Sequence, residues 1–529
     1  MRFSRHASSG VAASDRVIGK KSEMGGEYAA RLLMSGFMTA LVWAAMAGCA
    51  RNPVSGMPEV TMVSVEQEKK IGAEEAKNVE QQMGLLDDAA LTGYLDTLGQ
   101  RLAKESPRQD VVYQFRVADQ IDPNAFALPG GYIYVTRGLL ALTNSEDELA
   151  GVVGHEIGHV AARHSVQKIS KQGPFAVVFG IASGLTGLIS PLVGNLIGGI
   201  GDFTQSLIFS PYSRSQETQA DRIGQDMAAQ AGWDPAGLSS FLATLEREVQ
   251  LVTKGPERHS FFDSHPATPD RVAKTQKHAK ELKQAGREPI SPSRDAFLAR
   301  LNGLVVGQRA ANGIIQGSTF IHPDSNFLIQ FPEKWAIANS PLKILAAAPS
   351  GDVAIALSAA AESADPMDGA RAVERASKVP IVQQTRTTTI NGLPAAEAQL
   401  DADGKVRVDL TWIAQGGLIY QIAAIAQTKR FNDARPLFIS TVRSFRPLTA
   451  AERADVKETR IRLVPARAGE TIDALAGRSH SAWSKEEIAV ANGLDAQQPL
   501  QEGRLLKVTV AEPYESKRLP NNPSAMTVR

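Results

Sequence analysis

The chain has 529 residues, of which 43% are hydrophobic and 21% charged, which is ordinary for globular proteins and predicts about three domains. Its formal net charge of +1 gives no reason to expect a nucleic acid or a strongly charged partner. Its one cysteine, Cys49, excludes an intrachain disulfide.

The N-terminal region has the pattern of a secretion signal. An apolar run follows several basic residues and ends in Ala47-Gly48-Cys49, which resembles a bacterial lipoprotein signal whose cysteine becomes the lipid-modified first residue. We therefore predict a signal peptide at 1–49, lipidation of Cys49 and a linker at 50–60. Ala50 resembles outer-membrane sorting, so we expect a periplasmic protein of a Gram-negative bacterium, lipid-anchored with the outer membrane favoured. The alternative is an uncleaved membrane anchor, although about 16 apolar residues are short for a full span.

Predicted helices and short strands open the region from residue 61 to residue 310. Apolar residues at helical spacing predict helices over 63–77 and 89–104. β-branched and aromatic residues predict strands over 111–117 and 132–135. The strand at 132–135 either forms the edge of a cleft, where an extended substrate backbone could pair with it, or lies in the core.

A helix that begins near Ser145 carries the main chemical signal. Ser145 and the glutamate three residues later have the spacing of a capping box, which predicts the helix start. His155 and His159 follow at i and i+4, so two imidazoles can point at one metal ion from one face. Glu156 stands beside the first of them, where its carboxylate can reach a metal-bound water as a general base. Two histidines that fall by chance on an ordinary helix are the alternative.

A second helical segment at 213–221 offers a third ligand. A catalytic zinc ion takes three protein ligands and keeps one position open. Glu217 would complete a site of two histidines and one glutamate, and Asp221, one turn further on, could orient a ligand imidazole. Taken alone, this acidic pair would be read as a solvated helix face.

Between these two segments, residues 174–201 contain seven glycines and no charged side chain. Pro191 divides the stretch, and neither half is long enough to cross a bilayer comfortably. We favour an apolar helical hairpin near the cleft that covers the site, touches lipid or touches an unfolded client. A transmembrane hairpin and an ordinary buried hairpin are the alternatives.

Together these residues resemble the M48 family of zinc metallopeptidases, over roughly residues 50–285. The motifs that carry the resemblance are His155–His164, Glu217–Asp221, Ser264-His265-Pro266 with Arg271 downstream, Asn52–Gly56 and Asn124–Gly131. The match is most similar to periplasmic, lipid-anchored members associated with outer-membrane protein quality control. It implies a mainly helical zincin domain of the gluzincin type at 61–310. It also implies one Zn²⁺ per chain, held by His155, His159 and Glu217, with Glu156 as general base.

The resemblance also places a gating histidine at His265, with Arg271 in the same motif. A neutral imidazole there could take the open position on the metal; alternatively, His265 donates a hydrogen bond to the reacting carbonyl. His164 lies about 140° around the helix from His159, which makes it a poor ligand and indicates a neighbouring or core histidine.

The function that follows is a zinc endopeptidase that hydrolyses misfolded or stalled envelope proteins. The alternative is an outer-membrane assembly factor or chaperone whose peptidase site is mostly latent. In either case unfolded or misassembled envelope proteins, and possible contact with the outer-membrane assembly machinery, are the expected partners.

Two smaller domains are predicted after the peptidase region. Alternating apolar residues at 406–412 and 418–422 predict a β-hairpin with one buried face, inside a block at 318–447 that resembles the small α/β domains of the PsbP and Mog1 type. With no catalytic cluster in it, binding or scaffolding is expected.

Residues 459–511 have the order strand, helix, helix, strand, and resemble a LysM domain in Gly469-Glu470-Thr471 and Ala491–Leu494. Such modules bind peptidoglycan-type glycans, and a plain protein-interaction module is the alternative. Residues 512–529 are expected to be a disordered tail. The predicted fold class is therefore α+β: a helical zincin domain, a small α/β domain and a βααβ module.

Overall fold

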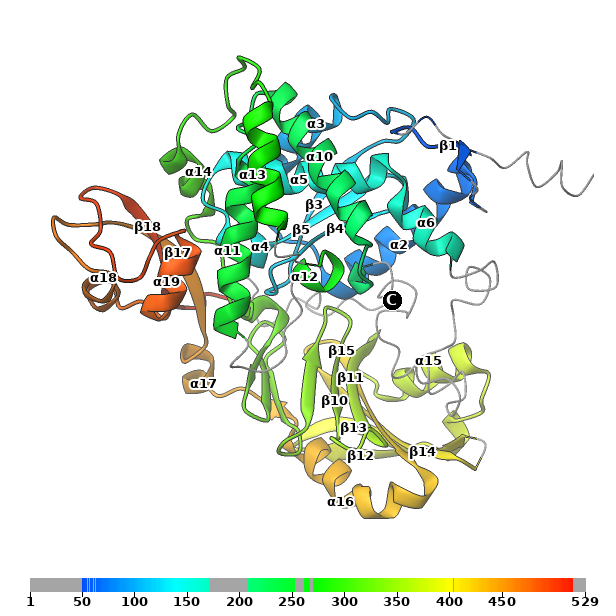
Figure 1. The fold of residues 1–529 in the computed structure, drawn as a ribbon. Coiled ribbons are helices and arrows are strands. Elements are labelled where there is room, and N and C mark those ends of the chain that lie inside the picture. The colour runs from blue at the N-terminus through cyan, green and yellow to red at the C-terminus, as the bar shows by residue number, and fades with distance from the viewer. Residues whose placement is uncertain are drawn as a thin grey trace, which may run out of the picture.

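The computed structural model describes residues 50–516 except 55, 57, 60, 62, 172–207, 253–260, 267–269 and 403 (Figure 1). The predicted signal peptide with Cys49, the uncharged stretch at 174–201 and most of the predicted tail lie outside the described residues. The described chain is a mixed α/β protein in three parts: a helical part, a central sheet domain and a C-terminal module. None of its described helices is long and apolar enough to cross a bilayer.

The helical part packs its helices around a three-stranded sheet with the order β3-β5-β4 (Figure 1). Its strands are β1 (Ala50–Arg51), β2 (Pro58–Glu59), β3 (Gln114–Ala118), β4 (Ala125–Leu128) and β5 (Tyr132–Thr136). Its helices are α2 (Val65–Met83), α3 (Ala89–Ala103), α4 (Arg137–Leu142), α5 (Glu146–Ala161), α6 (His164–Lys171), α10 (Arg214–Ala231), α11 (Gly237–Val252), α12 (Phe261–Ser264), α13 (Arg271–Glu281) and α14 (Arg294–Leu301). One hydrophobic core joins α3, α4, α5, α10 and α11 to the sheet.

Strand β5 is the centre of that sheet. It pairs in parallel with β3 and antiparallel with β4, so both of its backbone edges are occupied. Of the two alternatives for the strand at 132–135, the structure therefore supports the core strand and not the cleft edge. β4 lies at the margin of the sheet, and among the described residues no strand pairs with its outer edge.

Capping residues explain the limits of α2. The Ser64 side chain accepts from Gln67 N, and the Gln67 side chain accepts from Ser64 N, which forms a capping box. Gly84 at φ 74° ends the helix. The predicted end at residue 77 is too early. The buried side chains of Val79 and Met83 continue the core face of the helix to its end.

The central domain is built on a seven-stranded antiparallel sheet with the order β12-β13-β14-β15-β11-β10-β9. These strands are β9 (Ala336–Asn339), β10 (Lys343–Ala347), β11 (Val353–Glu362), β12 (Arg386–Ile390), β13 (Leu393–Ala402), β14 (Val406–Gln415) and β15 (Leu418–Gln427). A smaller sheet contains β6 (Ile314–Gln316), β7 (Thr319–His322), β8 (Phe327–Gln330) and β16 (Arg446–Pro447).

Helices α15 (Met367–Ser377) and α16 (Thr428–Ser444) cover opposite faces of the large sheet, and each face has its own hydrophobic cluster. The predicted hairpin is β14–β15, joined by Gly416 and Gly417 at positive φ. Its predicted single buried face is wrong, because the two helices bury β15 on both sides.

The C-terminal module has the predicted order: β17 (Lys457–Pro465), α18 (Ile472–Ser479), α19 (Lys485–Ala491) and β18 (Leu505–Pro513), preceded by the short α17 (Ala450–Ala454). β17 and β18 form an antiparallel pair. β18 continues past the predicted module end at residue 511, since its pairing with β17 extends to Pro513, opposite Lys457.

The module lies against the helical part, beside α11 (Figure 1). Residues 303–306 form backbone hydrogen bonds with 459–461, for example from Ile461 N to Leu304 O at 2.9 Å. The fully buried Lys507 Nζ donates to Ala141 O at 2.8 Å and to Thr143 O at 2.6 Å, between α4 and α5. The junction is therefore part of the fold rather than a flexible tether.

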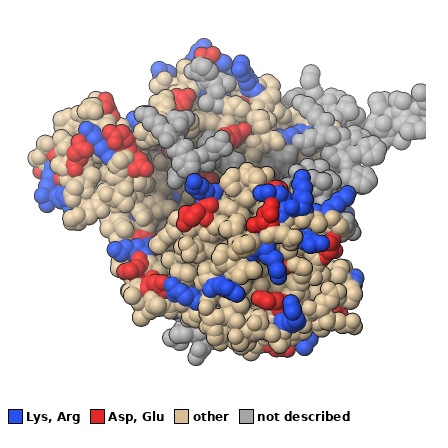
Figure 2. All heavy atoms as spheres, turned by 90° about the horizontal axis from the view of Figure 1, so that it is seen from below, with Lys and Arg blue, Asp and Glu red and all other residues tan. Residues whose placement is uncertain are grey.

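Seen from below, the molecule shows basic and acidic side chains interspersed over the central domain (Figure 2). No large patch of one sign covers this face. That distribution agrees with the formal net charge of +1.

Candidate metal centre

A close contact between α5 and α10 brings the predicted ligands together. A Cβ atom added at Gly158 of α5 would lie 2.9 Å from Ala220 O of α10, so only glycine allows this backbone approach. Because Glu217 lies on α10, the contact places its carboxylate beside His155 and His159.

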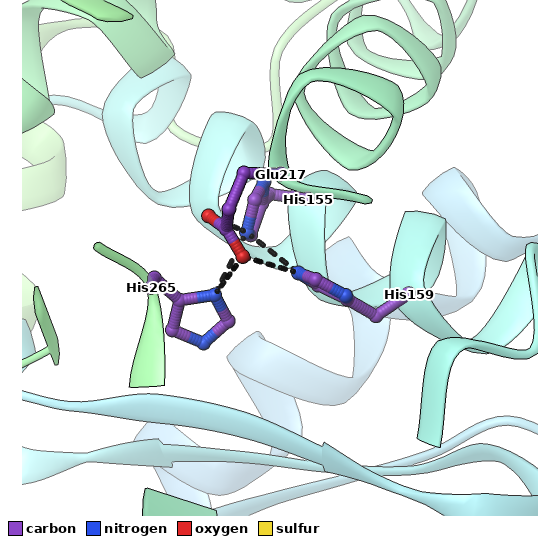
Figure 3. A group of neighbouring side chains, drawn as sticks. All are labelled: His155, His159, Glu217 and His265. Carbon is purple, nitrogen blue, oxygen red and sulfur yellow. Dashed lines mark hydrogen bonds and ion pairs between the residues drawn. The ribbon is translucent and has the colours of Figure 1, made fainter. Parts of the chain in front are cut away.

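The ligand atoms of His155, His159, Glu217 and His265 all lie within 4.8 Å of one another (Figure 3). The Nε2 atoms of His155 and His159 are 3.0 Å apart, and Glu217 Oε1 is 3.4 Å from His159 Nε2. His265, one residue past α12, places Nδ1 3.1 Å from Glu217 Oε1. All four side chains are buried, and imidazoles with a carboxylate are a donor set that suits Zn²⁺.

The pKa shifts of His159 and Glu217 favour metal binding, whereas that of His155 runs the other way: burial acts to lower its pKa, but Asp221 and Glu217 outweigh burial and raise it. Burial lowers the pKa of His159 well below its usual range, and the neighbouring His155 adds to the shift. Burial acts to raise the pKa of Glu217, but His265, His159 and Arg271 outweigh it and hold that pKa well below its usual range. A neutral imidazole and an ionised carboxylate are the forms that bind a metal.

Glu156 reaches the same cluster from α5. Its Oε1 lies 3.4 Å from His265 Nε2, and among the described residues neither of its carboxylate oxygens has a hydrogen-bond partner. Burial raises the pKa of this carboxyl. Leaving a buried carboxyl without partners costs free energy, so this group fits a role toward something bound at the cluster better than a structural role.

Asp221 and Arg271 stand behind the ligands. Asp221 Oδ1 lies 2.9 Å from His155 Nδ1, on the side of the ring opposite the cluster. Arg271 donates to both Asp221 oxygens, at 2.7 and 2.9 Å, and its Nη1 lies 2.8 Å from Glu217 Oε2. This buried network fixes the orientation of one imidazole and one carboxylate of the cluster.

His164 contacts a ligand rather than the cluster centre. Its Nδ1 lies 2.9 Å from His159 Nδ1, and its Nε2 lies 3.1 Å from Gln219 Oε1. Burial lowers the pKa of His164 to about 4, so its ring is neutral at pH 7. The predicted offset of about 140° assumed one continuous helix, but α5 ends at Ala161, Arg163 has a φ of 58° and His164 begins α6.

The sequence reasoning missed Tyr212. Its ring stacks on His159 with centroids 4.0 Å apart, its hydroxyl lies 3.1 Å from Ser165 Oγ, and its backbone N–H donates to Ser264 O at 3.0 Å. Tyr212 precedes Ser213, the N-cap of α10, and an apolar residue at that position often packs back onto its helix. That pattern could have marked the residue, but not its contact with His159.

Buried polar groups also hold the C-terminal end of α5. Glu68 of α2 accepts from Arg108 at 2.7 and 3.0 Å and from Arg163 Nε at 3.0 Å. Arg108 also donates to Val160 O at 3.0 Å, directly after His159. The N-terminal motif joins this region as well, since Asn52 Nδ2 donates to Ala162 O at 3.1 Å.

Comparison with known proteins places the chain among peptidases. The model of peptidase family M48 matches residues 89–279. The "Beta-barrel assembly-enhancing protease" of Yersinia pestis is 29% identical over 254 residues, which are 47% of this chain and 51% of that protein. The chain therefore spans about half the length of such relatives.

Two further matches differ in what they support. The solution structure of cyanobacterial PsbP from Synechocystis is 11% identical, covers 27% of this chain and 99% of its own, and has a TM-score of 0.21, so it carries no argument about the fold. The "Mitochondrial metalloendopeptidase OMA1" of Schizosaccharomyces pombe is 30% identical over 241 residues, which are 45% of this chain and 68% of that protein. With the matched family model, this similarity shows that the chain belongs to peptidase family M48.

Proposed function

We propose that this metallopeptidase is a zinc-dependent endopeptidase with His155, His159 and Glu217 as metal ligands and Glu156 as general base. The observation that carries the proposal is the Glu156 carboxyl, which is buried without a hydrogen-bond partner among the described residues and faces the ligand cluster. An ordinary structural glutamate would be paired at that depth.

The protein side chains divide the work of peptide hydrolysis. When bound, Zn²⁺ supplies the Lewis acidity that lowers the pKa of water toward neutrality. A carboxylate oxygen of Glu156 accepts the proton of the attacking water and later delivers it to the leaving amine. Asp221 holds His155 through Nδ1, and Arg271 holds Asp221 and Glu217, so the ligands are positioned before substrate arrives.

An extended substrate would bind along β4. This strand is the sheet margin next to α5, and β-strand addition supplies backbone hydrogen bonds to a peptide without regard to its sequence. That mode suits an enzyme that cuts unfolded chains and agrees with the zincin fold of the gluzincin type expected for residues 61–310.

His265 is the proposed gate of the site. Its Nδ1 belongs to the four-residue cluster, so its imidazole stands where a fourth ligand would bind, while its Nε2 faces Glu156. In that place it competes with the attacking water, and the enzyme stays inactive until the turn after α12 moves.

Misfolded or stalled proteins of the cell envelope are the proposed substrates, because relatives of this chain are named as assembly-enhancing proteases. The proposed location is the periplasm, with a lipid anchor at Cys49 in the outer membrane. The C-terminal module is proposed to bind peptidoglycan as a LysM-like domain, and the central domain to bind or scaffold partners, including the assembly machinery.

Replacing Glu156 by glutamine tests the enzymatic proposal. The full chain with Glu156→Gln should keep one zinc per chain and lose hydrolysis of an unstructured substrate by about 10²-fold or more. The control Glu66→Gln changes an exposed carboxylate on α2 and should retain both the zinc and the hydrolysis. Hydrolysis at the wild-type rate in Glu156→Gln would contradict the proposal.

The same variant separates the enzyme from its alternative. A latent assembly factor or chaperone would function in cells without hydrolysis. Complementation of a deletion strain by Glu156→Gln would therefore favour that alternative, and failure with normal protein levels would favour the peptidase.

A further inference from the structure

A cavity of about 760 Å³ lies between the helical part and the C-terminal module. Ligand pockets in proteins usually measure roughly 300–1,000 Å³, so this one has the size of a binding site. Its apolar lining comes from both sides of the junction, with Ile121, Leu142 and Leu251 on one side and Trp483 and Val490 on the other.

The walls of this cavity are fixed in place. Besides Lys507, two arginines join the parts: Arg247 donates to Leu494 O at 2.9 Å, and Arg294 donates to Leu505 O at 2.8 Å. The module therefore does not need to close around a ligand, and the ordering cost of binding is reduced.

Carboxylates dominate the charge of the cavity. Glu248, Glu486 and Glu487 line it together with one arginine, Arg137; Glu487 also accepts from Ser484 N in the capping box of α19, and Glu486 is exposed. That guanidinium is already engaged, with Asp119 Oδ1 at 2.6 Å and the carbonyls of Val305 and Gly307 at 2.9 and 2.6 Å. The cavity thus combines apolar and acidic lining residues, which suits a ligand with an apolar side chain and a positive charge.

One lining residue connects the cavity to the metal centre. Pro123 lines the cavity, and Pro123 O accepts from Phe261 N at 2.9 Å, at the first residue of α12. Phe261 O in turn accepts from His265 N at 2.9 Å, and the Phe261 ring stacks on His265 with centroids 4.2 Å apart. A ligand that presses on Pro123 therefore acts on the element that carries His265.

We propose that this cavity binds an extended peptide segment of another protein, with a large apolar side chain next to a lysine or arginine, and that its occupancy displaces His265 through Pro123 and Phe261. The second half of this proposal rests on the proposed gating role of His265. The first half, the binding, does not depend on catalysis.

Binding is tested in the full chain carrying Glu156→Gln, so that no probe is cleaved. The probe is acetyl-Lys-Leu-Phe-Lys-amide, titrated by calorimetry, with acetyl-Glu-Leu-Phe-Glu-amide as the reversed-charge comparison. We expect the basic probe to bind and Glu486→Lys to weaken it roughly fivefold. The control Glu502→Lys reverses an exposed charge of the same module away from the cavity and should change nothing.

Several results would overturn the docking site: no binding of the basic probe at millimolar concentration, equal binding of the acidic probe, or equal weakening by both substitutions. Binding only after residues 253–260 are replaced by a Gly-Ser linker would assign the cavity to the chain itself and equally overturn it.

The coupling between the cavity and His265 is measured by hydrogen exchange at residues 261–265 in the same inactive chain. We expect the saturating probe to change exchange there, and Glu486→Lys at the same probe concentration to reduce the change. Binding that leaves these amides unaffected would overturn the coupling. Because neither measurement uses hydrolysis, their failure is distinguishable from failure of the peptidase proposal.

Discussion

Tyr212 and His159 stack at 4.0 Å between ring centroids with 27° between their planes. The same tyrosine holds Ser264 through its backbone, so one residue contacts a proposed ligand and the turn that carries His265. Burial raises the pKa of its phenol, so the hydroxyl is protonated at pH 7.

We expect Tyr212→Ala to weaken metal binding by about 10-fold to 100-fold, because His159 loses the ring that fixes its orientation. Tyr212→Phe keeps the ring and loses only the contact with Ser165, so it should bind metal nearly as the wild type does. Competition with a chromophoric chelator measures both affinities. Equal weakening by the two substitutions would assign the effect to the hydroxyl instead.

Glu217→Ala should remove most bound zinc, because the histidine pair alone leaves the coordination incomplete. Asp226→Ala, on the same helix at a half-exposed position, is the control and should keep its metal. Zinc content after dialysis decides the matter. Full occupancy in Glu217→Ala would exclude Glu217 from the site.

His265→Ala should change the rate of substrate cleavage in opposite directions under the two roles considered for His265. As a gate, its removal should raise basal cleavage of an unstructured substrate and self-cleavage, with zinc retained. If His265 instead stabilises the reacting carbonyl, turnover should fall by about 10²–10³. Initial rates of the purified variant separate the two, and a fall would rule out the gate.

Lys507 should make stability depend on pH. Burial lowers its pKa from 10.5 to about 7, although the nearby Glu148 carboxylate opposes the shift. Between about pH 7 and pH 10 the unfolded chain therefore holds one more proton at this site, and its contribution to the free energy of unfolding rises with pH. That contribution is lost as the pH falls to about 7.

Lys507→Met removes this dependence, so the stability difference between wild type and variant should change with pH across that window. Denaturant unfolding of both proteins from pH 7 to pH 10 measures it. Lys457→Met, at an exposed position of the same module, should run parallel to the wild type. Parallel curves for Lys507→Met as well would show that the buried amine keeps its ordinary pKa.

Local spacing predicted side chains that the structure brings together at the candidate metal centre, but not the residues that surround them. His155 and His159 share a helix face because of a four-residue interval, and that interval is visible in the sequence. The contacts of Tyr212 with His159 and of Lys507 with Thr143 join residues far apart in the chain, so no periodicity in the sequence predicts them. They depend on how helices pack after they form.

The open question about the strand at 132–135 has the same origin, whereas the error about β15 does not. The residues at 132–135 predict a strand, but whether it is central or marginal depends on the order of three strands. In β15 a signal was present and went unused: Leu418–Gln427 is an almost continuous apolar run, which indicates burial on both faces rather than one.

With the proposed lipid anchor on Cys49, the contact of Asn52 would limit how far the metal centre can lie from the membrane. The Asn52 side chain is fastened to Ala162, at the end of the helix that carries His155 and His159, and only three positions separate it from Cys49. A lipid on Cys49 would leave at most about 10 Å of chain between the lipidated residue and Asn52. Helix α5, which carries His155 and His159, would then lie close to the bilayer surface, and only substrate chains that reach that surface would be cut.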